Sequence, residues 1–172
     1  DGDGSQVAHY LPTGIMSDKA VDWLDKAIIE GRVTSGGSIV HGRMSDFPFD
    51  EGNGKFETRF GVEGGRLDYA EGWPSVYDID AEVQFLGKGL FVNAEHGKIF
   101  SNDIQWATVT LPDMKAESLM TFIKGNVKGI TQDKLNVLVE SPQLNESFGN
   151  NLEGMKTTGE SMLHLDLDLP IG

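Results

Sequence analysis

The chain has 172 residues, no cysteine, and 27 acidic against 14 basic side chains, which gives a formal net charge of -13 at pH 7. A chain of this length can bury a sizeable core without disulfides or a structural metal, and the absence of cysteine excludes thiol nucleophiles and thiolate zinc sites. The acidic balance works against nucleic-acid binding, and no apolar run approaches the ~18 residues of a membrane-spanning helix. We therefore expect a soluble segment with no nucleic-acid partner.

The first residues, Asp1-Gly2-Asp3-Gly4, stand where a methionine and a signal peptide would begin a complete secreted protein. This start indicates a processed product or a segment of a longer protein. No internal linker, low-complexity tract or charge block divides the remaining chain. We predict a linker at residues 1–9 and a single β-rich domain at residues 10–172.

The clearest helical pattern begins at Ser17, a favourable N-cap residue, and is predicted to end at Gly31. Its apolar residues recur at i, i+3, i+4, i+7 and i+8, which gives one stripe that must pack on another part of the protein. These residues are Ala20, Val21, Leu24, Ala27 and Ile28. The helix is therefore expected to dock on a larger element.

Most of the chain after Arg32 alternates apolar and polar residues, which is typical of strands with one buried face. The alternation is clear over residues 55–63 and 78–85. Gly87-Lys88-Gly89 then predicts a tight hairpin turn.

Later segments continue the β pattern, with one helical interruption. Residues 103–111 change parity partway, which predicts a bulge or burial on both sides, and residues 119–123 predict a strand with two apolar faces. A short helix is predicted over residues 131–140, followed by a loop rich in Asn, Gly and Ser. The strictest alternation places four leucines on one strand face: Leu163, Leu165, Leu167 and Leu169.

These elements predict a mainly β (α+β) fold, with a broad curved antiparallel sheet or half-open β-groove, one docked N-terminal helix and a second short helix. The one-sided strands carry more apolar surface than one such helix can cover. The sheet must therefore curl on itself, pair with another sheet or hold a ligand. The residues predicted to line its apolar face are Phe56, Phe60, Val62, Leu67, Tyr69, Ile79, Val83, Phe85, Leu90 and Val92.

The sequence contains no recognisable motif for catalysis, metal binding or a cofactor. The histidines are scattered, without a paired zinc-binding arrangement. They are His9, His41, His96 and His164. His164, Asp166 and Asp168 share one strand face, but the alternating leucines already require polar residues there, so we interpret this face as solvated. We predict no catalytic residues, no metal and no cofactor.

A series of short motifs runs from residue 10 to the end of the chain: Tyr10-Leu11-Pro12, Val21-Asp22-Trp23-Leu24-Asp25-Lys26-Ala27, Asp46-Phe47-Pro48-Phe49, Gly54-Lys55-Phe56, Tyr69, Gly72-Trp73-Pro74 and Leu165-Asp166-Leu167-Asp168-Leu169-Pro170. Each motif is degenerate by itself, but their order and spacing are specific. Together they resemble the YhdP branch of the AsmA-like proteins, which are bacterial bridge-like lipid transfer proteins.

That resemblance implies a long protein of a Gram-negative bacterium, anchored in the inner membrane by an N-terminal helix, with a periplasmic body of β-rich repeats. This chain would be an internal periplasmic segment. Its implied partners are phospholipid acyl chains and neighbouring repeats of the full-length chain. In the family, curved sheets stack into a hydrophobic groove that carries phospholipids toward the outer membrane, and there are no catalytic residues to transfer to this sequence.

The leading hypothesis is a lipid-binding module that covers acyl chains while their head groups remain in water. Glutamate at Phe60 or Val83 is expected to abolish lipid occupancy and to leave the protein folded. Two alternatives stay open. The sheet edges could pair with neighbouring repeats in a purely structural module, or a β-sandwich could bind glycan through Trp73 and Trp106.

Overall fold

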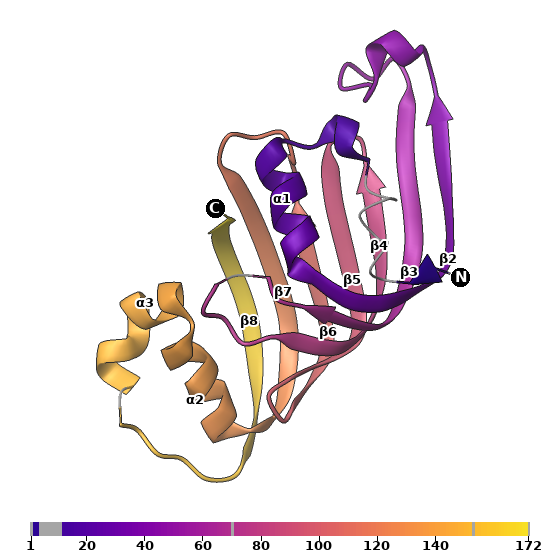
Figure 1. Ribbon diagram of the computed structural model, residues 1–172. Coiled ribbons are helices and arrows are strands. Elements are labelled where there is room, and N and C mark those ends of the chain that lie inside the picture. The colour runs from indigo at the N-terminus through magenta and orange to yellow at the C-terminus, as the bar shows by residue number, and fades with distance from the viewer. Residues whose placement is uncertain (1, 4–11, 70, 153, 172) are drawn as a thin grey trace.

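The computed structural model describes residues 2–3, 12–69, 71–152 and 154–171. Most of the predicted linker at residues 1–9, and the first two residues of the motif at 10–12, lie outside these ranges. Within them, eight strands form one antiparallel sheet in which every strand pairs with its neighbour in sequence (Figure 1). The strands are β1 (Gly2–Asp3), β2 (Ile28–His41), β3 (Lys55–Leu67), β4 (Val76–Leu86), β5 (Gly89–Ile99), β6 (Asn102–Leu111), β7 (Leu119–Ile130) and β8 (Glu160–Ile171).

Three α-helices and two short 3-10 turns accompany the sheet in the part of the chain that the structure describes. The α-helices are α1 (Asp18–Ala27), α2 (Thr131–Glu140) and α3 (Pro142–Leu152), and the short 3-10 turns are η2 (Thr13–Ile15) and η3 (Met44–Asp46). In the described ranges, none of these helices has the length and apolar character needed to cross a membrane. The prediction of a mainly β fold with a broad, curved, half-open sheet is confirmed.

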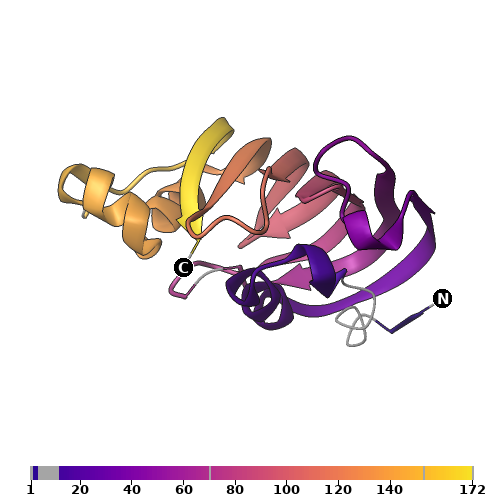
Figure 2. The ribbon, with the colours of Figure 1, turned by 90° about the horizontal axis from the view of Figure 1, so that it is seen from above.

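The sheet is strongly curved, and α1 lies on its inner side (Figures 1 and 2). The pairing of β3 with β2 and with β4 contains register shifts, at which an extra residue bends a strand. One shift falls between Val62 and Gly65, where Gly64 adopts a φ of 60° that favours glycine. The ends of β2, β3 and β4 consequently turn across the inner side of the sheet (Figure 2).

Helix α1 begins where the sequence predicts and ends earlier. The Ser17 side chain accepts a hydrogen bond from the backbone N–H of Ala20 at 3.3 Å, which confirms the N-cap. The predicted end at Gly31 is wrong, because the helix ends at Ala27 and Ile28 is already extended, with φ -86° and ψ 105°. Ile28 instead pairs with β3 as the first residue of β2. Consecutive β-branched isoleucines favour this strand ladder over another helical turn.

The helix predicted at residues 131–140 is confirmed as α2, but the loop predicted after it is wrong. Pro142 occupies the first position of α3, where the missing N–H is not needed. The Asn145 N–H donates to the carbonyl of Ser141 at 2.8 Å, and Leu144 is buried. Packing of this leucine outweighs the weak helix propensity of the surrounding Asn, Gly and Ser residues.

A buried lysine attaches α2 to the sheet. The Nζ of Lys134 donates to the carbonyl oxygens of Gly129 (2.7 Å) and Ser161 (2.9 Å) and to Oδ1 of Asn102 (3.3 Å). Burial lowers the pKa of Lys134, and nearby carboxylates partly oppose this shift. These bonds hold the start of α2 against β6, β7 and β8.

Candidate functional site

The strand register places apolar side chains in rows that cross the sheet on its inner face. Val83 pairs with Val92, which pairs with Val109. The same row continues through Ile123 to Leu167 on β8. This set, here called the branched row, therefore extends across five consecutive strands: Val83, Val92, Val109, Ile123 and Leu167.

A second row of smaller residues lies beside the branched row. Ala81, Ala94, Ala107 and Gly125 pair with one another across β4–β7, and Gly125 then pairs with Leu165. Because neighbouring strands are about 4.8 Å apart, the row from β4 to β8 is about 19 Å long. A row of small side chains therefore runs next to a row of branched ones across the strands.

Helices pack on the inner face near both ends of the strands, and the β3–β4 connection crosses the face between them (Figures 1 and 2). Near the β4–β5 turn, Ala20 and Leu24 of α1 belong to one buried cluster with Phe85 and Leu90. At the opposite end, Val137 of α2 packs against a second buried cluster. That cluster comprises Ile99, Ile104 and Val127.

Between these two clusters the side chains of both rows are half-buried, apart from the buried Gly125. We call the two rows, including Leu165, the open band. The open band contains no charged or titratable side chain. Its geometry can cover an apolar chain, and it offers no group for acid–base or nucleophilic chemistry.

Comparison with known proteins identifies the family. The sequence matches the family model described as YhdP protein over residues 1–172. This chain belongs to the YhdP protein family. It is also 27% identical over 169 residues to the Intermembrane phospholipid transporter YhdP of Escherichia coli (strain K12). That match covers 98% of this chain, which spans 13% of the length of the curated relative. No solved structure gives a significant match.

The lining residues predicted from the sequence fall into three groups in this YhdP-family chain. Four are buried in the cluster that contains α1: Phe56, Phe60, Phe85 and Leu90. Three pack against that cluster and remain half-buried: Val62, Val83 and Val92. The others, Leu67, Tyr69 and Ile79, are half-buried near the bent ends of β3 and β4. Burial raises the pKa of the Tyr69 hydroxyl.

Part of the open band was missed because it lies beyond a bulge. The register of β6 with β7 shifts between Ile104 and Trp106, so Val109 returns to the inner face on the opposite parity. The parity change within residues 103–111 signalled this bulge, but not its position. Ile123 and Leu167 fit the apolar–polar alternation of their own strands. The sequence did not indicate that they lie in one row with Val109.

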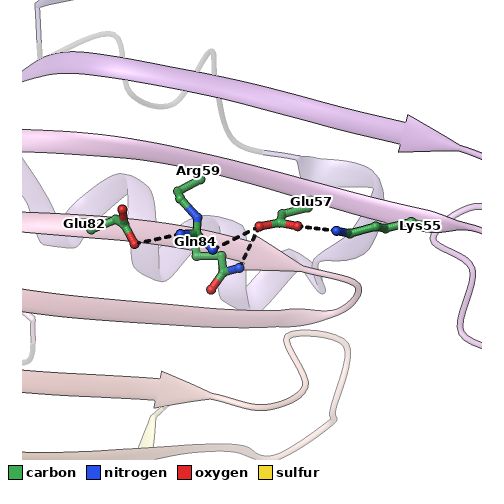
Figure 3. Close-up of polar contacts among 5 residues, drawn as sticks. All are labelled: Lys55, Glu57, Arg59, Glu82 and Gln84. Atoms are coloured by element: carbon green, nitrogen blue, oxygen red, sulfur yellow. Dashed lines mark hydrogen bonds and ion pairs between the residues drawn. The ribbon is translucent and has the colours of Figure 1, made fainter.

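The outer face of the YhdP-family sheet carries charged side chains that bind one another across β3 and β4 (Figure 3). The carboxylate of Glu57 accepts a hydrogen bond from Gln84 (2.8 Å). It also forms ion pairs with Lys55 (2.8 Å) and Arg59 (3.2 Å). Arg59 also contacts Glu82 at 3.3 Å. The hydrogen bonds from Lys55 and then Gln84 lower the pKa of Glu57. This polar network is typical of a solvated face.

Acidification is expected to weaken this network. Because the pKa of Glu57 is lower in the folded than in the unfolded chain, the network stabilises the fold at neutral pH and loses that contribution as pH falls through the folded-state pKa. Urea unfolding at about pH 7 and about pH 3 should therefore show a larger loss of stability in the wild type than in Glu57→Gln. Equal acid sensitivity of the two proteins would contradict a role for this carboxylate.

The polar residues of β8 lie on the outer face, as their alternation predicts. His164, Asp166 and Asp168 are exposed, and Lys124 binds Asp166 at 3.1 Å. Over the described ranges, no group of three or more His, Asp and Glu side chains is arranged to hold a metal ion.

The two tryptophans considered for glycan binding lie in different surroundings. Trp106 is exposed on β6, whereas Trp73 lies in the β3–β4 connection. The ring of Trp73 meets that of Tyr69 edge to face, with centroids 5.5 Å apart. Both residues belong to the β3–β4 connection, so this contact packs two parts of the connection against each other.

Proposed function

We propose that this chain is a non-enzymatic periplasmic module of a phospholipid transport protein, and that its inner face covers acyl chains in transit. The open band carries this proposal, because it crosses β4–β8 without a charged side chain. At ~0.8 kcal/mol per buried methylene, two chains of about sixteen carbons gain roughly 25 kcal/mol gross from leaving water. A continuous apolar surface would let a lipid move sideways with its chains covered.

The name of the relative supports the same function for the longer protein. The Escherichia coli protein is an Intermembrane phospholipid transporter. A protein that moves phospholipid between two membranes must shield acyl chains from the water between them. In a Gram-negative bacterium that space is the periplasm. We therefore propose a periplasmic location for this segment, within a chain anchored in the inner membrane that supports outer-membrane lipid homeostasis.

We assign the lipid contacts to the half-buried side chains of the inner face. Among the residues predicted from the sequence, Val83 and Val92 belong to the open band, and Val62 borders it. The buried Phe60 and Phe85 would support the sheet beneath α1. The open band adds side chains that sequence reasoning missed: Ala107, Val109, Ile123, Leu165 and Leu167.

The free edge of β8 favours a second role that is compatible with the first. Among the described residues, the 12-residue strand β8 has a strand neighbour on one side only, so the backbone groups of about every second residue face away from β7. A neighbouring repeat of the full-length chain could add a strand at this edge. Concentration-dependent oligomers that carry no lipid would favour a purely structural role.

Mass spectrometry of organic extracts from the purified protein tests the lipid role. We expect phospholipid in stoichiometric amount, because an open apolar band should retain lipid through purification. A protein of similar charge, taken through the same bacterial preparation, controls for carry-over. Lipid-free, monodisperse protein that also takes up no phospholipid from vesicles would contradict lipid binding by this segment.

A further inference from the structure

The connection between β3 and β4 reaches across the inner face. A Cβ atom at Gly72 in this connection would lie 3.0 Å from Cγ of Pro142, the first residue of α3. Three strands separate β4 from β8, so the two edges of this region lie about 19 Å apart along the sheet. The connection therefore extends in front of the later strands to meet α3, as both views show (Figures 1 and 2).

The same connection is attached to α1 at its other end. The backbone N–H of Asp68 donates to the carbonyl of Ala27 at 2.8 Å. The indole Nε1 of Trp23 donates to the carbonyl of Tyr69 at 2.7 Å. Asp68, Tyr69 and residues 71–75, here called the strap, thus link the end of α1 to the start of α3.

The strands that carry the strap bend toward the inner face at defined positions. Register shifts interrupt β3 on both sides of Gly65, and β4 between Tyr77 and Asp80. The side chain of Asp80 accepts a hydrogen bond from the N–H of Gly64 at 3.1 Å, which joins the two bends. The paired bends direct both strand ends, and hence the strap, across the inner face of the sheet that carries the open band (Figures 1 and 2).

We propose that the strap gates access of lipid to the open band, and that the Trp23–Tyr69 hydrogen bond and the Gly72–Pro142 contact hold it closed. This inference rests on the lipid role proposed above. The strap is a connection outside the hydrogen-bonded strand ladder, and its described ends are held by the Trp23–Tyr69 hydrogen bond and the Gly72–Pro142 contact. Connections outside the ladder open locally at a lower free-energy cost than core strands, so the strap can move while the sheet stays folded.

Cysteine labelling of protein freed of lipid by organic extraction or detergent exchange tests the movement of the strap. The chain has no cysteine, so each variant carries a single thiol. Ala107→Cys places a single thiol on the open band, and Thr108→Cys places a matched thiol on the outer face of the same strand. Trp23→Phe removes the indole donor while keeping an aromatic ring. We expect Trp23→Phe to increase the maleimide labelling rate at position 107 about five-fold, and to leave position 108 unchanged.

A second variant acts at the other end of the strap. Gly72 has a φ of 77°, so Gly72→Ala is strained there and brings a methyl group against Pro142. It should increase labelling at position 107 as Trp23→Phe does. Cooperative unfolding identifies the variants that remain folded. If such a variant is labelled at position 107 at the wild-type rate, the proposal that the strap is a gate is overturned.

Uptake of a fluorescent phosphatidylethanolamine from phosphatidylethanolamine–phosphatidylglycerol vesicles then tests what the strap controls. We expect faster uptake by Trp23→Phe than by the wild type. Equal uptake rates, despite faster labelling, would overturn the gate while retaining the proposed lipid role. Faster labelling without uptake by any variant would instead overturn the proposed lipid role, and the gate with it.

Discussion

Val109→Glu is expected to abolish phospholipid uptake while leaving the protein folded. Val109 is half-buried in the branched row, between Val92 and Ile123. A carboxylate at this position stays hydrated when no lipid is bound. An acyl chain that covers the row must remove this hydration, and this desolvation costs several kcal/mol of binding free energy. Transfer of a fluorescent phospholipid from vesicles to the purified variant should fall at least about tenfold.

The neighbouring residue supplies a matched control. Thr108 lies on the outer face of the same strand and pairs with Asn93 and with Lys124. Thr108→Glu introduces the same charge beside a lysine, where it remains in water, and should leave uptake unchanged. Equal losses in the two variants would show that added charge, rather than its position on the inner face, impairs uptake, and would contradict the assignment of the branched row.

Phe60→Glu is expected to have the largest effect on stability. Phe60 is 8% exposed, and its ring centroid lies 6.3 Å from that of Phe85 in the cluster beneath α1. Removing the ring and burying an unpaired carboxylate should cost about 4 kcal/mol or more, a large fraction of the stability of a typical domain. Urea unfolding monitored by circular dichroism checks this result.

This expectation differs from the one drawn from alternation alone, which treated Phe60 and Val83 as equivalent and both variants as folded. The structure separates them, because α1 covers the first and leaves the second half-exposed. Phe60→Leu should lose only about 1 kcal/mol, since an apolar side chain still fills the site. If Phe60→Glu proved as stable as Phe60→Leu, the side chain would belong to the lipid surface instead of the core.

Local patterns predicted much of the sheet. Alternation placed Phe56, Phe60 and Val62 on one face, and the turn at residues 87–89 joined the strands that carry Val83 and Val92. The register also brings Leu165 and Leu167 onto the same inner face, as their alternation required. These features depend on neighbours within a few residues or on one hairpin, so a single sequence contains them.

Other features depend on contacts between distant segments. Helix α1 ends early because Ile28 finds a strand partner in β3, about forty residues later. Helix α3 forms because Leu144 is buried, despite a composition typical of a loop. The open band could not be delimited for the same reason. Alternation identifies an apolar face, but only tertiary packing determines which part of that face α1, α2 and the strap cover.

The strict succession of strands gives this domain a linear correspondence between sequence and space. Each strand pairs with the next, so advancing along the chain by one hairpin advances roughly 10 Å across the sheet, in the direction in which the open band runs. Removing or duplicating a whole hairpin would therefore change the length of the apolar surface in fixed steps without changing its cross-section. In a protein that must reach from one membrane to another, the number of hairpins would set the distance that the apolar surface spans.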